Sequence, residues 1–190
     1  MTRIQMPARQ DMSARQAEIY DATVSGPRGK APAPLAAWLA SPELASRAQH
    51  LGAFVRYGTS LPAVLSELAI LVTARHWNAH YEWYAHKKEA LKAGLAPAII
   101  DAIAADAAPE FSVEVERLVY QFSVQLHAEH RVGDALYAQV VARLGTPAVV
   151  ELVGVIGYYT LVAMTLNVFD IGLPAGIAAD LPVLPAPDAC

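Results

Sequence analysis

The sequence predicts an all-α fold, a single-domain helical bundle that assembles into oligomers, and three observations carry this prediction. Ala-rich segments with helical periodicity follow one another along almost the whole chain. No Asn-Gly pair marks a β-hairpin, and β-branched residues rarely alternate with polar ones. The composition is 55% hydrophobic and only 17% charged, so we expect apolar surface to be buried between subunits as well as inside them.

Length and composition exclude several classes of protein. A chain of 190 residues is the size of one ordinary domain, which buries enough surface to fold without disulfides. The 14 basic and 18 acidic residues give a net charge of -4 with no basic run, which argues against a nucleic-acid partner. The single cysteine, Cys190, excludes a disulfide framework and a CxxC redox pair. Residues 1–10 are polar and lack the apolar core of a secretory signal, so we expect a cytoplasmic location.

The N-terminal part, residues 1–40, is expected to hold a helix and a loop. The helix should cover residues 13–24, and residues 26–34 should form a loop because they include three prolines and two glycines. A short helical turn is expected over residues 35–40. Ser41, Pro42 and Glu43 then supply an N-cap, a first-position proline and an acidic first turn for a helix ending at Gly58.

Residues 41–170 form the expected helical domain. The segment that begins at Ser60-Leu61-Pro62 continues to Ala93 and ends at Gly94, a typical C-cap glycine. Its length is compatible with a break near Trp77-Asn78, which the sequence does not settle. Further helices are expected over residues 96–105, 112–130, 134–145 and 146–170. The Pro-rich tail, residues 171–190, is expected to be an extended arm or a solvated end.

One segment has the length of a membrane span. The eighteen residues 152–169 carry no charge. They include glycines, tyrosines, threonines and an asparagine, and Glu151 and Asp170 flank them without a nearby Lys or Arg. We therefore expect a core helix that is apolar on all sides and buried inside an oligomer, and no membrane association.

The segment from Glu67 to Lys87 concentrates ionisable side chains, with three of the six histidines of the chain. Glu82 and His86 are four residues apart, so they share one face of a helix. A carboxylate beside an imidazole fixes its tautomer and raises its basicity, which makes a general acid–base pair. A solvent-exposed pair of modest stability explains the same spacing, and the sequence leaves both interpretations open.

A metal site is the other interpretation of this segment. His76 and His80 are also four residues apart, but their face is turned by roughly 90° from that of Glu82 and His86. One ion cannot collect all four side chains from a straight helix, so we expect no bound metal and no cofactor. On the last helix, Tyr159 and Asn167 are candidates for polar contacts in a pocket, whereas Tyr158 is expected in the core.

Several motifs of residues 41–95, and one of the last helix, resemble the carboxymuconolactone decarboxylase family, which includes the alkyl hydroperoxidase D branch. The resemblance implies an all-helical homo-oligomer, a trimer or hexamer with a dimer as the alternative, that acts on a small molecule. The motifs are the Ser41-Pro42 start, Leu61-Pro62 followed by Glu67, the block Tyr81-Glu82-Trp83 with His86-Lys87 and Gly94-Leu95, and Glu151 with Gly157-Tyr158-Tyr159 and Leu166-Asn167.

Two branches of this family predict different chemistry. The peroxidase branch has a Glu, a CxxC pair and a His, which fall on Glu67, Ala79, Glu82 and His86 of this chain. Both thiols are absent, and a thiol peroxidase needs a thiolate nucleophile, so a hydroperoxidase is disfavoured. The decarboxylase branch carries Glu-x-x-x-His, which Glu82 and His86 reproduce.

The sequence therefore predicts a cofactor-free acid–base enzyme that decarboxylates, or moves a proton on, a small lactone or carboxylic acid. Glu67, Glu82 and His86 are the expected catalytic residues, with His86 as the proton donor to carbon. Arg75 is expected to hold a carboxylate of the substrate. His80, Tyr81 and Tyr159 complete the expected substrate site. A hydroperoxidase and a non-catalytic ligand-binding or structural protein remain the alternatives.

Overall fold

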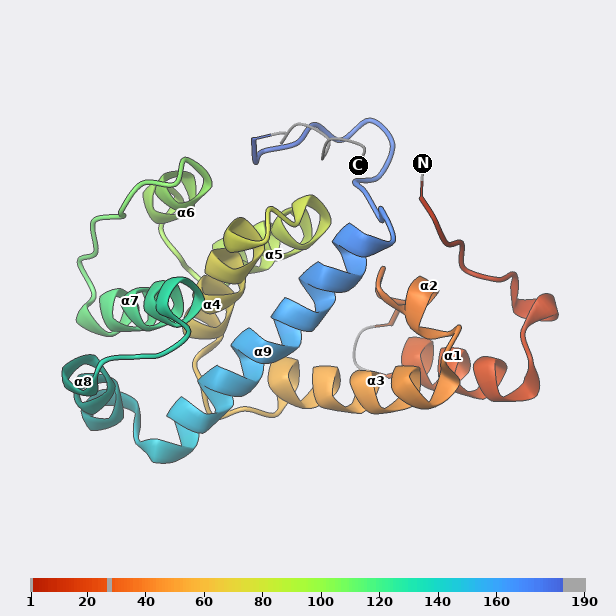
Figure 1. Ribbon diagram of the computed structural model, residues 1–190, viewed down its shortest axis with the longest axis horizontal. Coiled ribbons are helices and arrows are strands. Elements are labelled where there is room, and N and C mark those ends of the chain that lie inside the picture. Colours follow the sequence, from red (N-terminus) through yellow and green to blue (C-terminus); the bar gives the residue numbers. More distant parts are fainter. Residues whose placement is uncertain (1, 27–28, 183–190) are drawn as a thin grey trace.

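The fold is all-α, as predicted, in the computed structural model, which describes residues 2–26 and 29–182 (Figure 1). No strand occurs in these two ranges. A short 3-10 helix, Arg9–Asp11, precedes the α-helices. The α-helices are α1 (Ala14–Ser25), α2 (Leu35–Trp38), α3 (Pro42–Tyr57), α4 (Ala63–His76), α5 (His80–Lys92), α6 (Pro97–Ala104), α7 (Glu114–Glu129), α8 (Asp134–Leu144) and α9 (Thr146–Val168).

Helices α4 and α9 form the centre of the bundle. Helix α4 packs against α5, α7 and α9, and α9 also contacts α3, α5 and α8. Helices α1–α3 lie on one side of α9 and α6–α8 on the other (Figure 1). Residues 65–74 of α4 are all buried, which explains why this helix has no polar face. Glu67 belongs to that buried run, so its carboxylate must find a partner inside the protein.

Most helix boundaries follow the predicted start and stop signals. Ser13 and Gln16 form a reciprocal capping box at the start of α1, and Gly94 has the positive φ of +95° expected of a C-cap glycine. Ser41 is the N-cap residue of α3, with Pro42 and Glu43 in its first turn as predicted, although the Ser41 side chain makes no capping hydrogen bond. Helix α9 starts at Thr146, as predicted, with Gly145 as its N-cap residue.

The long segment expected over residues 61–93 is broken, at the position that the sequence left open. Helix α4 ends at His76 and α5 begins at His80. Asn78 between them has a φ of +47°, a left-handed conformation that Asn tolerates better than most residues. Because the chain turns here, the straight-helix geometry that placed His76 and His80 on one face does not apply.

Helix α9 has the length and hydropathy of a membrane span, and 56% of its apolar window is buried inside the fold. Its exposed part includes Val150 and Val153, which are 65% and 47% exposed. Beside Val150 lie Leu51 and Phe54 of α3, which are also exposed. Leu51, Phe54 and Val150 border an apolar groove between α3 and α9, the kind of surface that another protein surface covers in an assembly.

The described part of the tail folds back over α5. Lys87 forms an ion pair with Asp180, with 2.8 Å between Nζ and Oδ2, and Leu181 is buried. The side-chain amide of Asn78 donates to the carbonyl oxygen of Pro182 at 3.1 Å. Up to residue 182 the tail is therefore an arm held against its own chain, whereas Cys190 lies outside the described residues.

Candidate functional site

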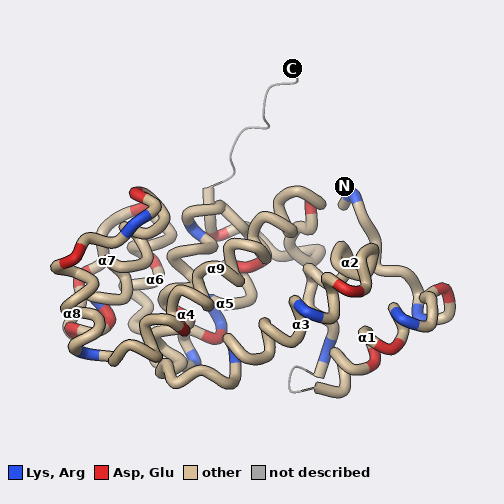
Figure 2. The backbone as a smooth tube through the Cα atoms, turned by 60° about the horizontal axis from the view of Figure 1, so that its bottom comes forward, with Lys and Arg blue, Asp and Glu red and all other residues tan. Residues whose placement is uncertain are grey.

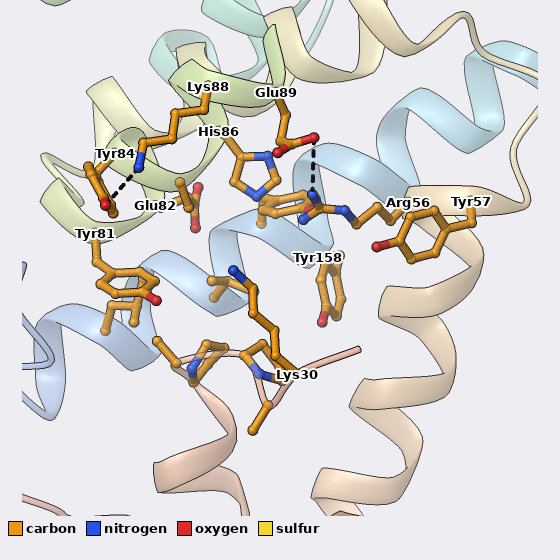
Figure 3. Close-up of a pocket in the computed structure, with 18 residues that line it drawn as sticks. Lys30, Arg56, Tyr57, Tyr81, Glu82, Tyr84, His86, Lys88, Glu89 and Tyr158 are labelled. Carbon is orange, nitrogen blue, oxygen red and sulfur yellow. Dashed lines mark hydrogen bonds and ion pairs between the residues drawn. The ribbon is translucent and has the colours of Figure 1, made fainter. Parts of the chain in front are cut away.

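The candidate site is a cavity of about 440 Å³ where α5, α9 and the end of α3 meet the loop before α2 (Figure 3). Its walls hold five of the eight tyrosines of the chain. These side chains combine aromatic surface with hydroxyl groups, as is common in pockets for small molecules. They are Tyr57, Tyr81, Tyr84, Tyr158 and Tyr159.

His86 of α5 is paired with Glu67 of α4. Nδ1 of His86 lies 2.6 Å from Oε2 of Glu67, and both side chains are buried. When Nδ1–H donates to this carboxylate, Nε2 is the ring nitrogen left with a lone pair for a substrate. The ring of Tyr159 meets the His86 ring edge to face at 4.7 Å between centroids, which holds the imidazole at the cavity wall. The two residues form a carboxylate–imidazole dyad.

Glu82 lies one turn before His86 and is not its partner, contrary to the pairing that helical spacing suggested. Its side chain points into the cavity (Figure 3) and is only 2% exposed. Neither carboxyl oxygen has a hydrogen-bond partner within the described residues. Burial raises the pKa of Glu82 well above its ordinary value, since an ionised carboxylate is poorly solvated there. Glu82 therefore offers a protonated carboxyl group to the cavity.

Three basic side chains, Lys30, Arg56 and Lys88, line the same cavity. The guanidinium of Arg56 is 22% exposed, and Glu89 lies 3.9 Å from it. Glu89 is itself bound more closely by Lys92, at 2.9 Å. The cavity is thus basic in a protein of net charge -4. Basic and acidic residues are otherwise interspersed along the chain (Figure 2).

The structure brings most of the predicted site residues together. Tyr81, Glu82, His86 and Tyr159 line the cavity, and Glu67 lies behind His86. It does not bring Arg75 or His80 there. Nε of Arg75 donates to the carbonyl oxygen of Ala104 at 3.1 Å, and Nε2 of His80 lies 3.3 Å from the Asn78 amide. Arg75 lies on α4 before the break and faces the end of α6, and His80 begins α5 directly after the break, so neither side chain reaches the cavity.

Other placements also differ from the expectations. Asn167 does not line the cavity, and its side-chain amide donates to the Trp77 carbonyl oxygen at 2.7 Å. Tyr158 is buried in the core, as expected, and in addition lines the cavity. Arg56 was not predicted, because the contact of α3 with this cavity has no signal in the local sequence. Among the residues that the structure describes, no group of three or more His, Cys, Asp or Glu side chains is placed to hold a metal ion.

Neither a family model nor a curated protein matches the chain, whereas solved structures do. An uncharacterized peroxidase-related protein with an alkylhydroperoxidase AhpD core, from Ralstonia eutropha JMP134, superposes with a TM-score of 0.74 at 13% identity, over 92% of this chain and 93% of that one. A peroxidase-related protein from Silicibacter sp. TM1040 gives 0.72 at 13%, over 92% of both chains.

A third similar structure is the debrominase Bmp8, as a cysteine-to-alanine variant in complex with 2,3,4-tribromopyrrole. It superposes with a TM-score of 0.69 at 13% identity, over 90% of both chains. At this level of identity the three similarities show the fold, which is AhpD-like.

Proposed function

On the basis of its AhpD-like fold and basic cavity, we propose that the chain is a cofactor-free acid–base enzyme of the carboxymuconolactone decarboxylase type. Its substrate is a small lactone or carboxylic acid, on which it performs decarboxylation or a related proton transfer. One observation carries the proposal. The Glu67–His86 dyad and the protonated carboxyl group of Glu82 lie at one cavity wall, so a base and an acid face the same substrate.

The dyad moves the proton at carbon. Nε2 of His86 takes or delivers this proton, and the carboxylate of Glu67 orients the imidazole and stabilises the imidazolium. In a decarboxylation, the breaking C–C bond leaves its electron pair on the substrate as CO₂ departs. The pair passes into the conjugated carbonyl group. His86, which has taken up a proton from solvent at Nε2, then delivers that proton to carbon and returns to the neutral imidazole.

Glu82 stabilises the charge that this step creates. Negative charge develops on the carbonyl oxygen of the substrate, where a neutral carboxyl group donates a hydrogen bond. An ordinary glutamate is ionised at neutral pH and repels that charge. The buried position of Glu82 keeps its proton in place, and the unpartnered oxygens leave it available to the substrate.

Arg56 takes the role that the sequence analysis predicted for Arg75. Its guanidinium lines the cavity and is weakly paired within the protein, so it is available to bind a substrate carboxylate with two parallel hydrogen bonds. Lys30 and Lys88 add positive charge at the same cavity. An anionic substrate is favoured over a neutral or cationic one.

The peroxidase reaction suggested by the names of two structural neighbours has less support in this chain. Ala79 and Glu82 stand where the resemblance places the two cysteines, and neither supplies a thiolate. The oligomer remains part of our proposal, as a trimer or hexamer that covers the groove between α3 and α9 with a second copy of the chain.

Assays of CO₂ release and of solvent-deuterium incorporation test the proposed reaction on a panel of lactone carboxylates that includes carboxymuconolactone. We expect turnover that His86→Asn abolishes, with His50→Asn, at an exposed position of α3, as the matched control. Peroxide reduction dependent on Cys190 would instead support the hydroperoxidase. Binding without turnover in the whole panel would support the non-catalytic alternative.

A further inference from the structure

A second cavity, of about 230 Å³, lies between α4, α7 and the end of α6 and shares no lining residue with the first. Apolar side chains, among them Val72, Ile103 and Val124, form part of its wall. Five polar residues complete it: Arg75, His76, Asp106, Tyr120 and His127. Arg75 and His76 belong to the segment rich in ionisable residues, and the proposed reaction uses neither of them.

The two histidines of this cavity are stacked on each other. The rings of His76 and His127 lie 4.5 Å apart between centroids, at an angle of 17°. The hydroxyl of Thr73 donates to the carbonyl oxygen of Ala69 at 2.9 Å. Its oxygen therefore accepts from Nε2–H of His127, 3.0 Å away. This bond fixes the tautomer of His127, and Nδ1 carries the lone pair that can take up a second proton.

Positive charge at this cavity is poorly matched by negative charge. The Asp106 carboxylate lies 3.5 Å from Nη2 of Arg75, but Asp106 is 79% exposed, so the pair is screened and weak. The Arg75 side chain is only 19% exposed. Two histidines that can each accept a proton lie beside it, and His130, directly after α7, lies close enough to His76 to lower its pKa. Tyr120 contributes a hydroxyl donor to the same wall.

We propose that this cavity binds a small tetrahedral oxyanion, sulfate or the phosphate group of a phosphate monoester. Arg75 supplies a permanent charge, His76 and His127 supply up to two more, and Tyr120 supplies a hydroxyl donor. This set matches a dianion better than a monocarboxylate, which would leave charge unbalanced. The volume of the cavity limits the ligand to a group of this size with a short substituent.

Binding of the anion is coupled to proton uptake. Burial and the neighbouring histidines lower the pKa of His76 and His127, the latter to about 4, so both rings are neutral in the empty site at pH 7. A dianion beside them favours the charged imidazolium and raises their pKa. The groups that face the pair are Arg75 of α4, Asp106 after α6, Tyr120 of α7 and His130 directly after α7. We expect affinity to increase as the pH falls from 7 to 5.

The test uses sulfate, which stays a dianion over this pH range, and follows the imidazole signals of His76 and His127 by NMR in the full chain. Sodium chloride at equal ionic strength is the reference. We expect sulfate to raise the pKa of His127 by about 1 unit. Acetate is compared with sulfate at pH 5.5, closer to the pKa expected for His127 with sulfate bound, with an effect of sulfate and none of acetate.

Two variants with opposite expected effects on sulfate affinity locate the bound anion. Asp106→Asn should tighten sulfate binding by about threefold, because it removes a competing carboxylate. Asn also tolerates the φ of 59° at this exposed position, so the variant should fold normally. Arg75→Gln should weaken binding by about tenfold, and Arg56→Gln, in the first cavity, should leave it unchanged. The proposal fails if chloride reproduces the sulfate effect, if Asp106→Asn does not tighten binding, or if Arg56→Gln abolishes it.

Discussion

The carboxylate of Glu67 accepts a hydrogen bond from the imidazole of His86 at 2.6 Å, across a separation of 19 residues. The pair joins the buried centre of α4 to the cavity-facing side of α5. The turn at Trp77-Asn78 allows this contact, because a continuous helix would carry His86 far from Glu67 along its axis. The dyad is thus a product of the helix break.

Removal of His86 should have a cost in stability as well as in turnover. His86→Ala leaves the buried Glu67 carboxylate without its partner, which costs about 1–3 kcal/mol in the free energy of unfolding. Adding Glu67→Gln to this variant should recover part of the loss, because a neutral amide is cheaper to bury than a charge. Denaturant unfolding of the two single variants and the double variant measures the coupling. Additive effects would show that the two side chains do not interact.

Glu82→Leu removes the hydrogen-bond donor to the developing oxyanion and should lower turnover by about 10²-fold or more. The same position predicts a pH effect on stability. The pKa of Glu82 is raised in the folded protein, so folding favours the protonated form. Its contribution is complete below the unfolded pKa of about 4.3 and is lost as the pH rises through the folded pKa. Melting temperatures of Glu82→Gln should therefore exceed those of the parent more at pH 8 than at pH 4.

Titration of His127 should make the stability of the fold depend on pH in the opposite direction. Burial and the adjacent His76 lower its folded pKa to about 4, so folding favours the neutral form. Its contribution is complete above the unfolded pKa of about 6.5 and is lost as the pH falls toward 4. Since the ring is partly exposed, we discount the effect to about 1–2 kcal/mol. His127→Gln should flatten the loss of stability between pH 6.5 and 4. An unchanged slope would contradict the assignment.

Arg56→Gln and Arg75→Gln form a matched pair of variants that tests substrate binding in the first cavity. Arg56→Gln should raise the KM of a carboxylate substrate by about tenfold, the loss of one charge-assisted contact. Arg75 lines the other cavity, so Arg75→Gln should leave KM unchanged. Steady-state kinetics of both variants checks this, and equal effects would mean that the substrate carboxylate is bound elsewhere.

Self-association should depend on the groove between α3 and α9. Val150 is 65% exposed, so Val150→Asp removes little from the core of a single chain but places a charge in the proposed interface. We expect light scattering to show an oligomer for the parent and a smaller species for the variant. Lys92→Asp, at an exposed position of α5, serves as the control. A parent chain that is monomeric in dilute solution would contradict the proposed assembly.

The sequence alone determined the helical architecture and the segment that carries the chemistry. Ser13, Gly58 and Gly94 mark helix ends through local backbone preferences, which act over a few residues and can be identified in the sequence. The concentration of His and Glu between Glu67 and Lys87 pointed to the candidate site for a similar reason, since buried ionisable groups are costly without a function or a partner.

Only the tertiary structure decided which of these side chains meet. Spacing along one helix paired His86 with Glu82, but the turn at Asn78 lets α5 pack back on α4, and Glu67 becomes the partner. Packing of α4 against α6 and α7 places Arg75 and His127 at one cavity, and packing of α3 against α9 brings Arg56 to the other. Contacts between helices depend on where each helix ends and how it packs, and these distances are set by the whole fold rather than by any local pattern.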